Sequence, residues 1–273
     1  MTAHGASREA LAAARERLDA LTDSTSVDAA QLSEELAAVT ALLHREVSLR
    51  RVLTDPAQPG EAKAELVRRI LGDQVGGTTV DLVSGLVRSR WSQSRDLVDA
   101  LEELADTADL TAAQKSGELD DVEDELFRFG RIVSSNTGLR SALTDRKATA
   151  AAKTELLHRL LGGRAKPTTE RLVTRLVTAP RGRSLEAGLE SLSKLAAERR
   201  NRLVAVVTSA VPLSDAQKQR LGAALAKLYG HPMHLNIDVD PEVLGGIRVQ
   251  VGDEVINGSI ADRIEDAGRR LAS

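Results

Sequence analysis

The 273-residue chain has no cysteine, which excludes a disulfide framework, a thiolate zinc site and a cysteine nucleophile. Its four aromatic side chains, Trp91, Phe127, Phe129 and Tyr229, are too few for a base-stacking platform. The 37 lysines and arginines against 40 aspartates and glutamates leave no basic footprint of the kind that binds nucleic acid. No run of about 18 apolar residues occurs, so no membrane-spanning helix is predicted. We therefore expect a soluble, intracellular protein with no nucleic-acid partner.

What the chain does contain is aliphatic and charged sequence with the period of short helices. Hydrophobic residues make up 42% of it, and most of them are alanine, leucine and valine. Leu32, Leu36 and Val39 recur at the spacing that places them on one face of a helix. Pro56 marks a turn after that region, because proline cannot continue a helical ladder. Short antiparallel helices of this kind form bundles, so the predicted fold class is mainly α.

An internal repeat is the strongest feature of the sequence. When the chain is shifted by 90 positions, residues 32–87 lie over residues 122–177 without a gap. The tripeptide Leu-Thr-Asp at 53–55, for example, recurs at 143–145. We infer a duplicated helical domain followed by a unique tail.

The repeat predicts three domains. They are a first helical bundle at residues 1–108, a second copy at 109–200 and a small α/β domain at 201–273. The first helix of the second copy is expected around residues 105–116, where its apolar stripe is short.

Several helix ends and boundaries are also predicted from local sequence. Gly72 is expected to close a helix in the left-handed conformation. Thr78 with Asp81 resembles a capping box that opens the next helix. The segment Arg181-Gly182-Arg183 is interpreted as a solvated linker, the default for a charge cluster between elements.

The tail changes from helical to mixed sequence. Residues 203–207 have the composition of a buried strand, and a helix is expected from Ser214 to Gly230. Two strands in which apolar and polar residues alternate are expected to begin at Met233 and at Ile247. A hairpin turn at 252–253 leads from the second of them to one more strand. A final helix opens at Ser259. The predicted order is β-α-β-β-β-α, a small sheet with helices packed on it.

One glycine-rich stretch could indicate nucleotide binding. Residues 72–78 have the glycine spacing of a phosphate-binding loop, but Thr78 stands where the lysine should be and the segment follows a helix instead of a strand. We interpret it as a helix end and loop. No set of residues is spaced for acid–base, nucleophilic or metal chemistry, so we predict no catalytic residue, no metal and no cofactor.

Three tail segments carry a family resemblance. They are Val-Thr-Ser-Ala-Val-Pro-Leu-Ser at 207–214, Val-Asp-Pro-Glu-Val-Leu-Gly-Gly-Ile at 239–247, and the segment 249–259 that ends in Asn-Gly-Ser. Together they resemble the delta subunits of bacterial F-type ATP synthases. That family commonly has Asp where this chain has Asn257, which can serve the turn but carries no charge. Members usually carry the helical domain once, and two copies are similar to the enlarged delta subunits of actinobacteria.

The resemblance implies a non-catalytic stator subunit in the peripheral stalk. It would link the alpha/beta catalytic head to the b-subunit stalk and resist rotor torque during proton-driven ATP synthesis, as a peripheral membrane protein at the cytoplasmic face of the cell membrane. Its partners would be the N-terminal helices of the alpha subunits, held between the first and fifth helices, and the C-terminal region of the b subunit, with no small-molecule substrate. The candidate partner-binding residues are Leu11, Leu18, Leu82, Leu86, Leu244, Gly245, Gly246, Gly258 and Ser259.

Two other functions remain open on the sequence. A cytosolic helical-repeat adaptor would explain the duplication equally well, although it does not account for the three tail segments. A nucleotide-dependent enzyme using the loop at 72–78 is the third interpretation.

Overall fold

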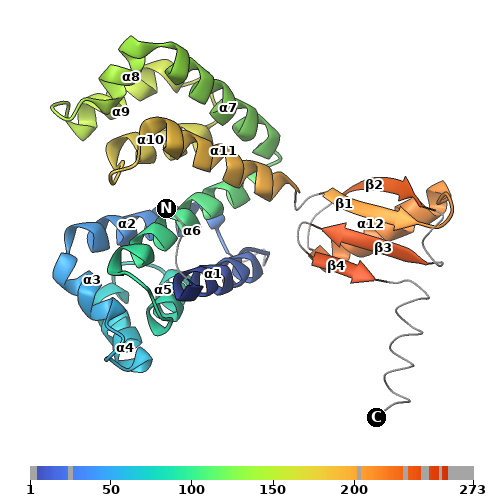
Figure 1. The fold of residues 1–273 in the computed structure, drawn as a ribbon, viewed down its shortest axis with the longest axis horizontal. Coiled ribbons are helices and arrows are strands. Elements are labelled where there is room, and N and C mark those ends of the chain that lie inside the picture. Colours follow the sequence, from blue (N-terminus) through green and yellow to red (C-terminus); the bar gives the residue numbers. More distant parts are fainter. Residues whose placement is uncertain are drawn as a thin grey trace. The chain divides into compact units, whose positions relative to one another are not determined.

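The computed structural model describes residues 5–23, 27–201, 204–229, 233–240, 246–251 and 254–257. The chain divides into two compact units, residues 1–196 and 197–273. The first is helical and the second contains a sheet (Figure 1). The predicted fold class, mainly α with a small α/β domain at the end, is therefore confirmed.

The helices that precede the sheet are short and follow one another closely. Their bounds are α1 (Gly5–Asp23), α2 (Ala29–Arg45), α3 (Val47–Thr54), α4 (Gly60–Leu71), α5 (Gly77–Arg88), α6 (Ser94–Lys115), α7 (Leu119–Ser135), α8 (Thr137–Thr144), α9 (Ala150–Leu161), α10 (Pro167–Thr178) and α11 (Leu185–Asn201). The turn predicted after Thr54 separates α3 from α4.

The internal repeat is visible in these bounds. Each helix from α7 to α10 begins and ends 90 residues after its counterpart among α2 to α5, as α2 at Ala29–Arg45 and α7 at Leu119–Ser135 illustrate. We call α1–α5 the first copy and α7–α11 the second copy. Because order, length and spacing all repeat, the two copies are two versions of one helical arrangement.

One helix lies between the two copies. The expected break between a last helix of the first bundle and a first helix near 105–116 is wrong, since Ser94–Lys115 forms the single helix α6. No glycine or proline interrupts this stretch, and residues 104–111 within it are all buried, which is typical of a helix inside a larger core. α6 contacts α1, α2 and α3 as well as α7 and α10 (Figure 1). The boundary expected at residue 108 therefore falls within a helix that contacts both copies.

The core of the first copy is built from aliphatic side chains and one indole. Leu36 and Leu43 of α2 meet Leu97 and Leu101 of α6, and all four are at most 2% exposed. Trp91, the third residue after α5, is buried in the same cluster, and its Nε1 donates to the Leu86 carbonyl at 2.8 Å. The indole thus closes the end of α5 with its one polar atom satisfied.

Two predicted helix ends differ from the structure. Gly72 has a right-handed φ of −55°, so it is not a left-handed cap. Glycine is required there because a Cβ atom would lie 2.5 Å from the Arg68 carbonyl oxygen. The capping box at Thr78 is also absent, since Gly76 is the N-cap of α5 and no local side chain caps it.

The second unit is a four-stranded sheet with one described helix. β1 (Val204–Ser209) leads into α12 (Asp215–Tyr229), followed by β2 (His234–Val239), β3 (Ile247–Val251) and β4 (Glu254–Asn257). The strand order is β2-β1-β3-β4, with β1 and β2 parallel and the other neighbouring pairs antiparallel. The first five predicted elements are present in order. The final helix expected from Ser259 lies outside the described residues.

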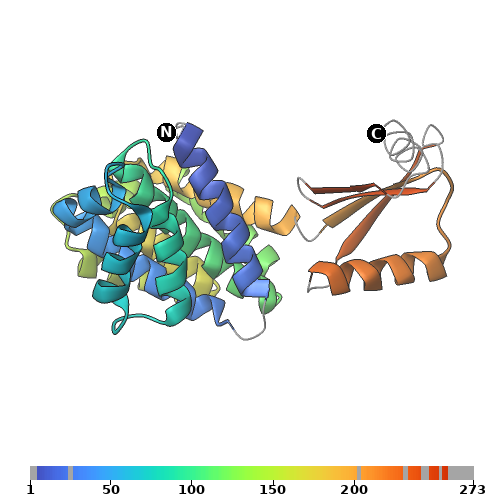
Figure 2. The ribbon, with the colours of Figure 1, turned by 90° about the horizontal axis from the view of Figure 1, so that it is seen from below.

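Alternation along the strands explains why α12 covers one face of the sheet. Ala205 and Val207 of β1 and Val249 of β3 are buried together with Leu225 of α12, and Figure 2 shows α12 lying along that face. At the end of the helix, the Tyr229 hydroxyl donates to Glu254 Oε2 at 2.8 Å. Burial, together with this carboxylate, raises the pKa of Tyr229 to about 12.

Candidate interaction site

Of the five leucines predicted to bind a partner, four lie in the helical part of the chain, and three of these four are inside the core. Leu18, Leu82 and Leu86 expose at most 2% of their surface, and Leu11 is half-buried against the same cluster. These side chains pack α1 and α5 against the other helices around the core of the first copy. A partner helix at this place would therefore contact the outward residues beside them.

The outer face of α5 is open and lined by small side chains. Gly77 and Asp81 are exposed and Gly85 is half-buried. The three residues are spaced by four, so they share one face of the helix. A Cβ atom at Gly77 or Gly85 would meet no atom within 4 Å. The first copy thus leaves room along α5, beside the contact that α5 makes with α1.

The same face is closed in the second copy. Arg171 and Arg175 of α10 stand 90 residues after Asp81 and Gly85. Arg175 Nη1 lies 2.7 Å from Asp106 Oδ1 of α6, and its Nη2 lies 2.8 Å from Asp109 Oδ2.

Further polar contacts complete this closure. Arg171 Nη2 lies 2.8 Å from Asp109 Oδ1. Arg175 Nη2 also donates to Ser33 Oγ on α2 at 3.1 Å, a contact with a first-copy helix. The face of α10 that carries Arg171 and Arg175 is therefore packed against α6. The corresponding face of α5, which carries Asp81 and Gly85, is open.

The loop after α10 adds two more arginines to α6. Arg181 pairs with Glu102 and donates from Nη1 to the Val98 carbonyl at 3.1 Å, and it lies 3.4 Å from an Asp99 oxygen. Arg183 Nη2 lies 2.5 Å from Glu102 Oε2. We call these groups the α6 ion cluster; its members are Asp99, Glu102, Asp106, Asp109, Arg171, Arg175, Arg181 and Arg183.

Burial sets the electrostatics of the α6 ion cluster. The side chains of Asp109 and Arg181 are 0% and 3% exposed. Burial raises the pKa of Asp106 to about 6, although Arg175 opposes the shift. Burial also lowers the pKa of Arg181 to about 10 against the pull of Asp99, so its guanidinium stays charged at neutral pH. Charges this deeply buried persist only where partners and hydrogen bonds compensate them.

The backbone is shaped to place Arg181 in this cluster. Arg181 has a φ of +47° and Gly182 a φ of +83°. A left-handed conformation in a bulky residue other than glycine costs on the order of 1 kcal/mol and persists where the surroundings hold it. Here Arg95 of α6 donates to the Arg181 carbonyl oxygen. The solvated linker predicted at 181–183 is wrong for Arg181, because its partners lie about 80 residues earlier in the chain.

A sequence signal for the cluster existed in α6. The four carboxylates of the cluster, among the six that α6 carries, are separated by three, four and three positions, the spacing of a single helix face. This stripe predicts a line of cations opposite, but the distance in sequence to the arginines hid which residues supply them.

A tertiary cap repeats in both copies and explains the missing capping box. Glu35 Oε2 of α2 accepts from the Gly76 amide at 3.0 Å and also from the Thr79 hydroxyl. In the second copy, Glu125 Oε2 accepts from the Lys166 amide at 2.9 Å and from the Thr169 hydroxyl at 2.5 Å. A carboxylate from α2 or α7 thus satisfies the amide of the N-cap residue of α5 or α10.

The same cap argues against phosphate binding at residues 72–78. The start of α5 offers the free amides that an anion would use. The Glu35 carboxylate already occupies that position through Gly76, and its negative charge would repel a phosphate.

The tail residues predicted to bind a partner are mostly outside the described ranges. The residues outside the described ranges are Leu244, Gly245, Gly258 and Ser259. Gly246 is described and has a φ of +91°, a conformation that glycine adopts without steric cost.

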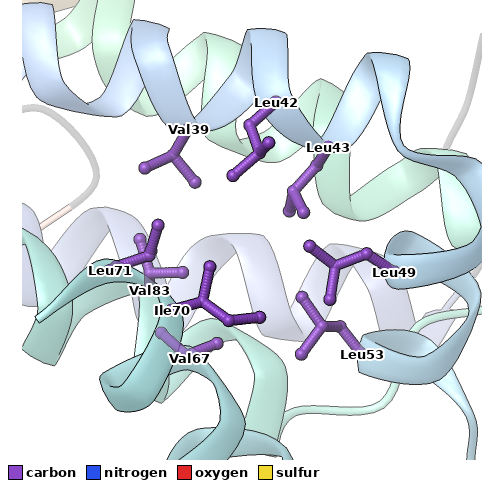
Figure 3. Close-up of a pocket in the computed structure, with 9 residues that line it drawn as sticks. All are labelled: Val39, Leu42, Leu43, Leu49, Leu53, Val67, Ile70, Leu71 and Val83. Atoms are coloured by element: carbon purple, nitrogen blue, oxygen red, sulfur yellow. The ribbon is translucent and has the colours of Figure 1, made fainter. Parts of the chain in front are cut away.

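An apolar pocket opens between α2, α3, α4 and α5 of the first copy. It measures about 240 Å³ when the part open to solvent is included. Figure 3 shows aliphatic side chains from all four helices pointing into one space. The lining residues are Val39, Leu42, Leu43, Leu49, Leu53, Val67, Ile70, Leu71 and Val83. In the second copy the buried ring of Phe129 stands 90 residues after Val39, so a larger side chain takes the corresponding position.

The described residues contain no site for metal chemistry. No three histidine, aspartate or glutamate side chains gather within them as a bound metal would require. None of the described helices combines the length and apolar content of a membrane span.

Comparison with known proteins places these features in a family. Residues 107–271 match the family described as ATP synthase delta (OSCP) subunit. The chain is 85% identical to ATP synthase subunit delta of Streptomyces coelicolor, over 99% of this chain and 98% of that protein. It is 83% identical to the Streptomyces avermitilis protein of that name over the full length of both, and 49% identical to the Thermobifida fusca one over 98% of this chain and 99% of that protein.

The family match begins within α6, so it covers the second copy and the tail, and the first copy precedes it. The full-length relatives extend the similarity over the first copy as well. The chain belongs to the ATP synthase delta (OSCP) subunit family.

Proposed function

We propose that this chain is a non-catalytic stator subunit of the peripheral stalk. It links the alpha/beta catalytic head to the b subunit and resists rotor torque during proton-driven ATP synthesis, at the cytoplasmic face of the cell membrane. The observation that carries this proposal is the full-length identity of 83–85% to proteins named ATP synthase subunit delta. The adaptor unrelated to ATP synthase is excluded by the same finding.

The first copy is the docking site for an alpha-subunit N-terminal helix. The outer face of α5 is open at Gly85, and the exposed residues Ala6, Ala13 and Ala20 run along α1 at intervals of seven. Small side chains let a further helix approach closely and bury apolar area in a groove. The matching face of α10 is covered by α6, so the second copy offers no equivalent place there.

A stator must stay bound under a steady load, and a broad contact between helices meets this requirement. Affinity from a broad helix-in-groove contact comes mainly from apolar burial, about 25 cal/mol per Å² before ordering costs.

Binding of an alpha-subunit N-terminal peptide to the full chain tests the docking site. Gly85→Leu fills the open space on α5, and we expect at least tenfold weaker binding with unchanged helix content. The control is Ala62→Leu, at an exposed position on α4, which should bind as the natural chain does. Equal binding by the Gly85 variant would refute this location.

The tail is proposed to hold the C-terminal region of the b subunit. Gly246→Val forces a β-branched residue to a φ of +91° just before β3, at a cost of about 1–3 kcal/mol. We expect this variant to lose b-subunit binding and amide protection in β1 and β3 while the helical copies stay protected. Hydrogen exchange with a b-subunit pull-down measures both, and normal b-subunit capture would count against the assignment.

A further inference from the structure

The α6 ion cluster joins helices of the two copies directly. Its carboxylates lie on α6, which packs on α1, α2 and α3. Its arginines come from α10 and the loop that follows. Arg175 spans the two copies most clearly, because it contacts Asp106, Asp109 and Ser33 of α2 at 2.7–3.1 Å.

The loop after α10 is held from two sides. The Arg181 guanidinium reaches Glu102 and the Val98 carbonyl, while the Arg181 carbonyl accepts from Arg95. Both contacts end on α6. The positive φ angle of Arg181 belongs to a tight turn that the Arg183 amide closes by donating to the Pro180 carbonyl at 3.0 Å. This turn directs the Arg181 side chain to α6, where both of the contacts above are made.

The energetics of buried charge make this arrangement stiff. If the second copy tilted away from α6, Asp109 and the arginines around it would separate inside a medium that solvates charge poorly. A broken buried pair leaves an uncompensated charge, so the energy rises steeply with displacement.

We infer that the α6 ion cluster locks the two helical copies into one rigid arm, and that removing its charges frees the second copy to move relative to the first. The inference goes beyond the proposed function and is independent of it, since it concerns the distance between the copies in the isolated chain. It gives a physical role to a duplication whose two copies are not equivalent at their surfaces.

A distance measurement between spin labels tests this lock. The chain has no cysteine, so labels at Ala62→Cys on α4 and Ala152→Cys on α9 are the only ones present. Both positions are exposed and stand 90 residues apart in the repeat. We expect one narrow distance distribution in the otherwise natural chain, and at least a doubling of its width after Arg175→Gln with Arg181→Gln.

The matched control is Arg128→Gln, which removes an exposed ion pair with Asp124 on α7 and should leave the width unchanged. If the double variant loses helix by circular dichroism, a second variant decides. Glu102→Gln, Asp109→Asn, Arg175→Met and Arg181→Met together remove two charges of each sign while keeping side-chain size, so the fold is kept and the width should double. An unchanged width in a folded variant would overturn the inference.

Discussion

The third residue after α5 is Trp91 and the third residue after α10 is Arg181, and the contrast shows how the two copies differ. Trp91 turns inward and completes the apolar core of its own copy. Arg181 turns outward from its copy and reaches the carboxylates of α6. The helices around them have the same bounds relative to the repeat, so the fold was kept while the surfaces changed. The first copy completes its own core and leaves space along α5, whereas the second copy is attached to α6 through Arg181.

The largest effect is expected at the paired positions 85 and 175. Arg175→Gln leaves buried Asp106 without its paired cation and Asp109 with Arg171 alone, and we expect a loss of about 3–5 kcal/mol in the free energy of unfolding. Gly85→Gln at the matching position should gain about 0.5–1 kcal/mol, because a side chain in open space replaces a helix glycine. Urea unfolding of the two variants measures both. Equal effects would mean that the two faces do not differ.

A pH series on Asp106 sharpens the comparison next. Its pKa is raised to about 6 in the folded chain, above the unfolded value of 3.8, so the folded state binds a proton more tightly. Stability contributed by this group is therefore present at low pH and is lost as the pH rises through about 6. The groups that face Asp106 are Arg175, Asp109 and Arg183.

The expected signature is a difference between variants. Between pH 7 and pH 5 the free energy of unfolding of the natural chain should rise relative to that of Asp106→Asn, by an amount on the order of 1 kcal/mol. Parallel curves for the two proteins would show that Asp106 is not buried against α10 in solution.

The tertiary caps should behave alike in the two copies. Glu35→Ala and Glu125→Ala each remove a charged acceptor from a helix amide and from a buried threonine hydroxyl. Hydrogen bonds to charged groups contribute about 1.5–3 kcal/mol each, and each variant loses two of them, so we expect each to lose about 3 kcal/mol by urea unfolding. A large loss in one copy alone would break the structural equivalence of the repeats.

The smallest expected effect is at the pocket of the first copy. Val39→Ile adds one methylene group to the pocket that Val39 lines. We expect the free energy of unfolding to rise by up to about 0.8 kcal/mol. Val87→Ile is the control, because Val87 is fully buried outside the pocket lining and has no space for the added group. A loss at Val39 as large as that at Val87 would show that the pocket closes in solution.

Periodic and repeated features were predictable from the sequence. The shift of 90 residues predicted the arrangement of α7–α10 from that of α2–α5. In the tail, strand composition predicted β1, a leucine stripe predicted α12, alternation predicted β2 and β3, and the hairpin turn predicted β4. These predictions succeed because apolar spacing reflects which face is buried, a property of each segment by itself.

Features that depend on distant residues were missed. α6 was divided into two helices because its two ends serve different copies, which the local pattern does not reveal. The prediction for the start of α5 missed the group that caps it, because Glu35 lies about 40 residues earlier in the chain. Arg181 was assigned to solvent because a charged residue between elements is usually exposed. In each case the deciding partner lies far away in sequence.

The central claim is that a partner helix lies on the outer face of α5 in the first copy of the assembled enzyme. Asp81→Cys places a single thiol on that exposed face, and its rate of reaction with a maleimide can be compared in the isolated chain and in the complete ATP synthase. The account predicts strong protection of Cys at position 81 on assembly, with Ala62→Cys on α4 still reactive. Equal reactivity at position 81 in the free and assembled states would contradict it.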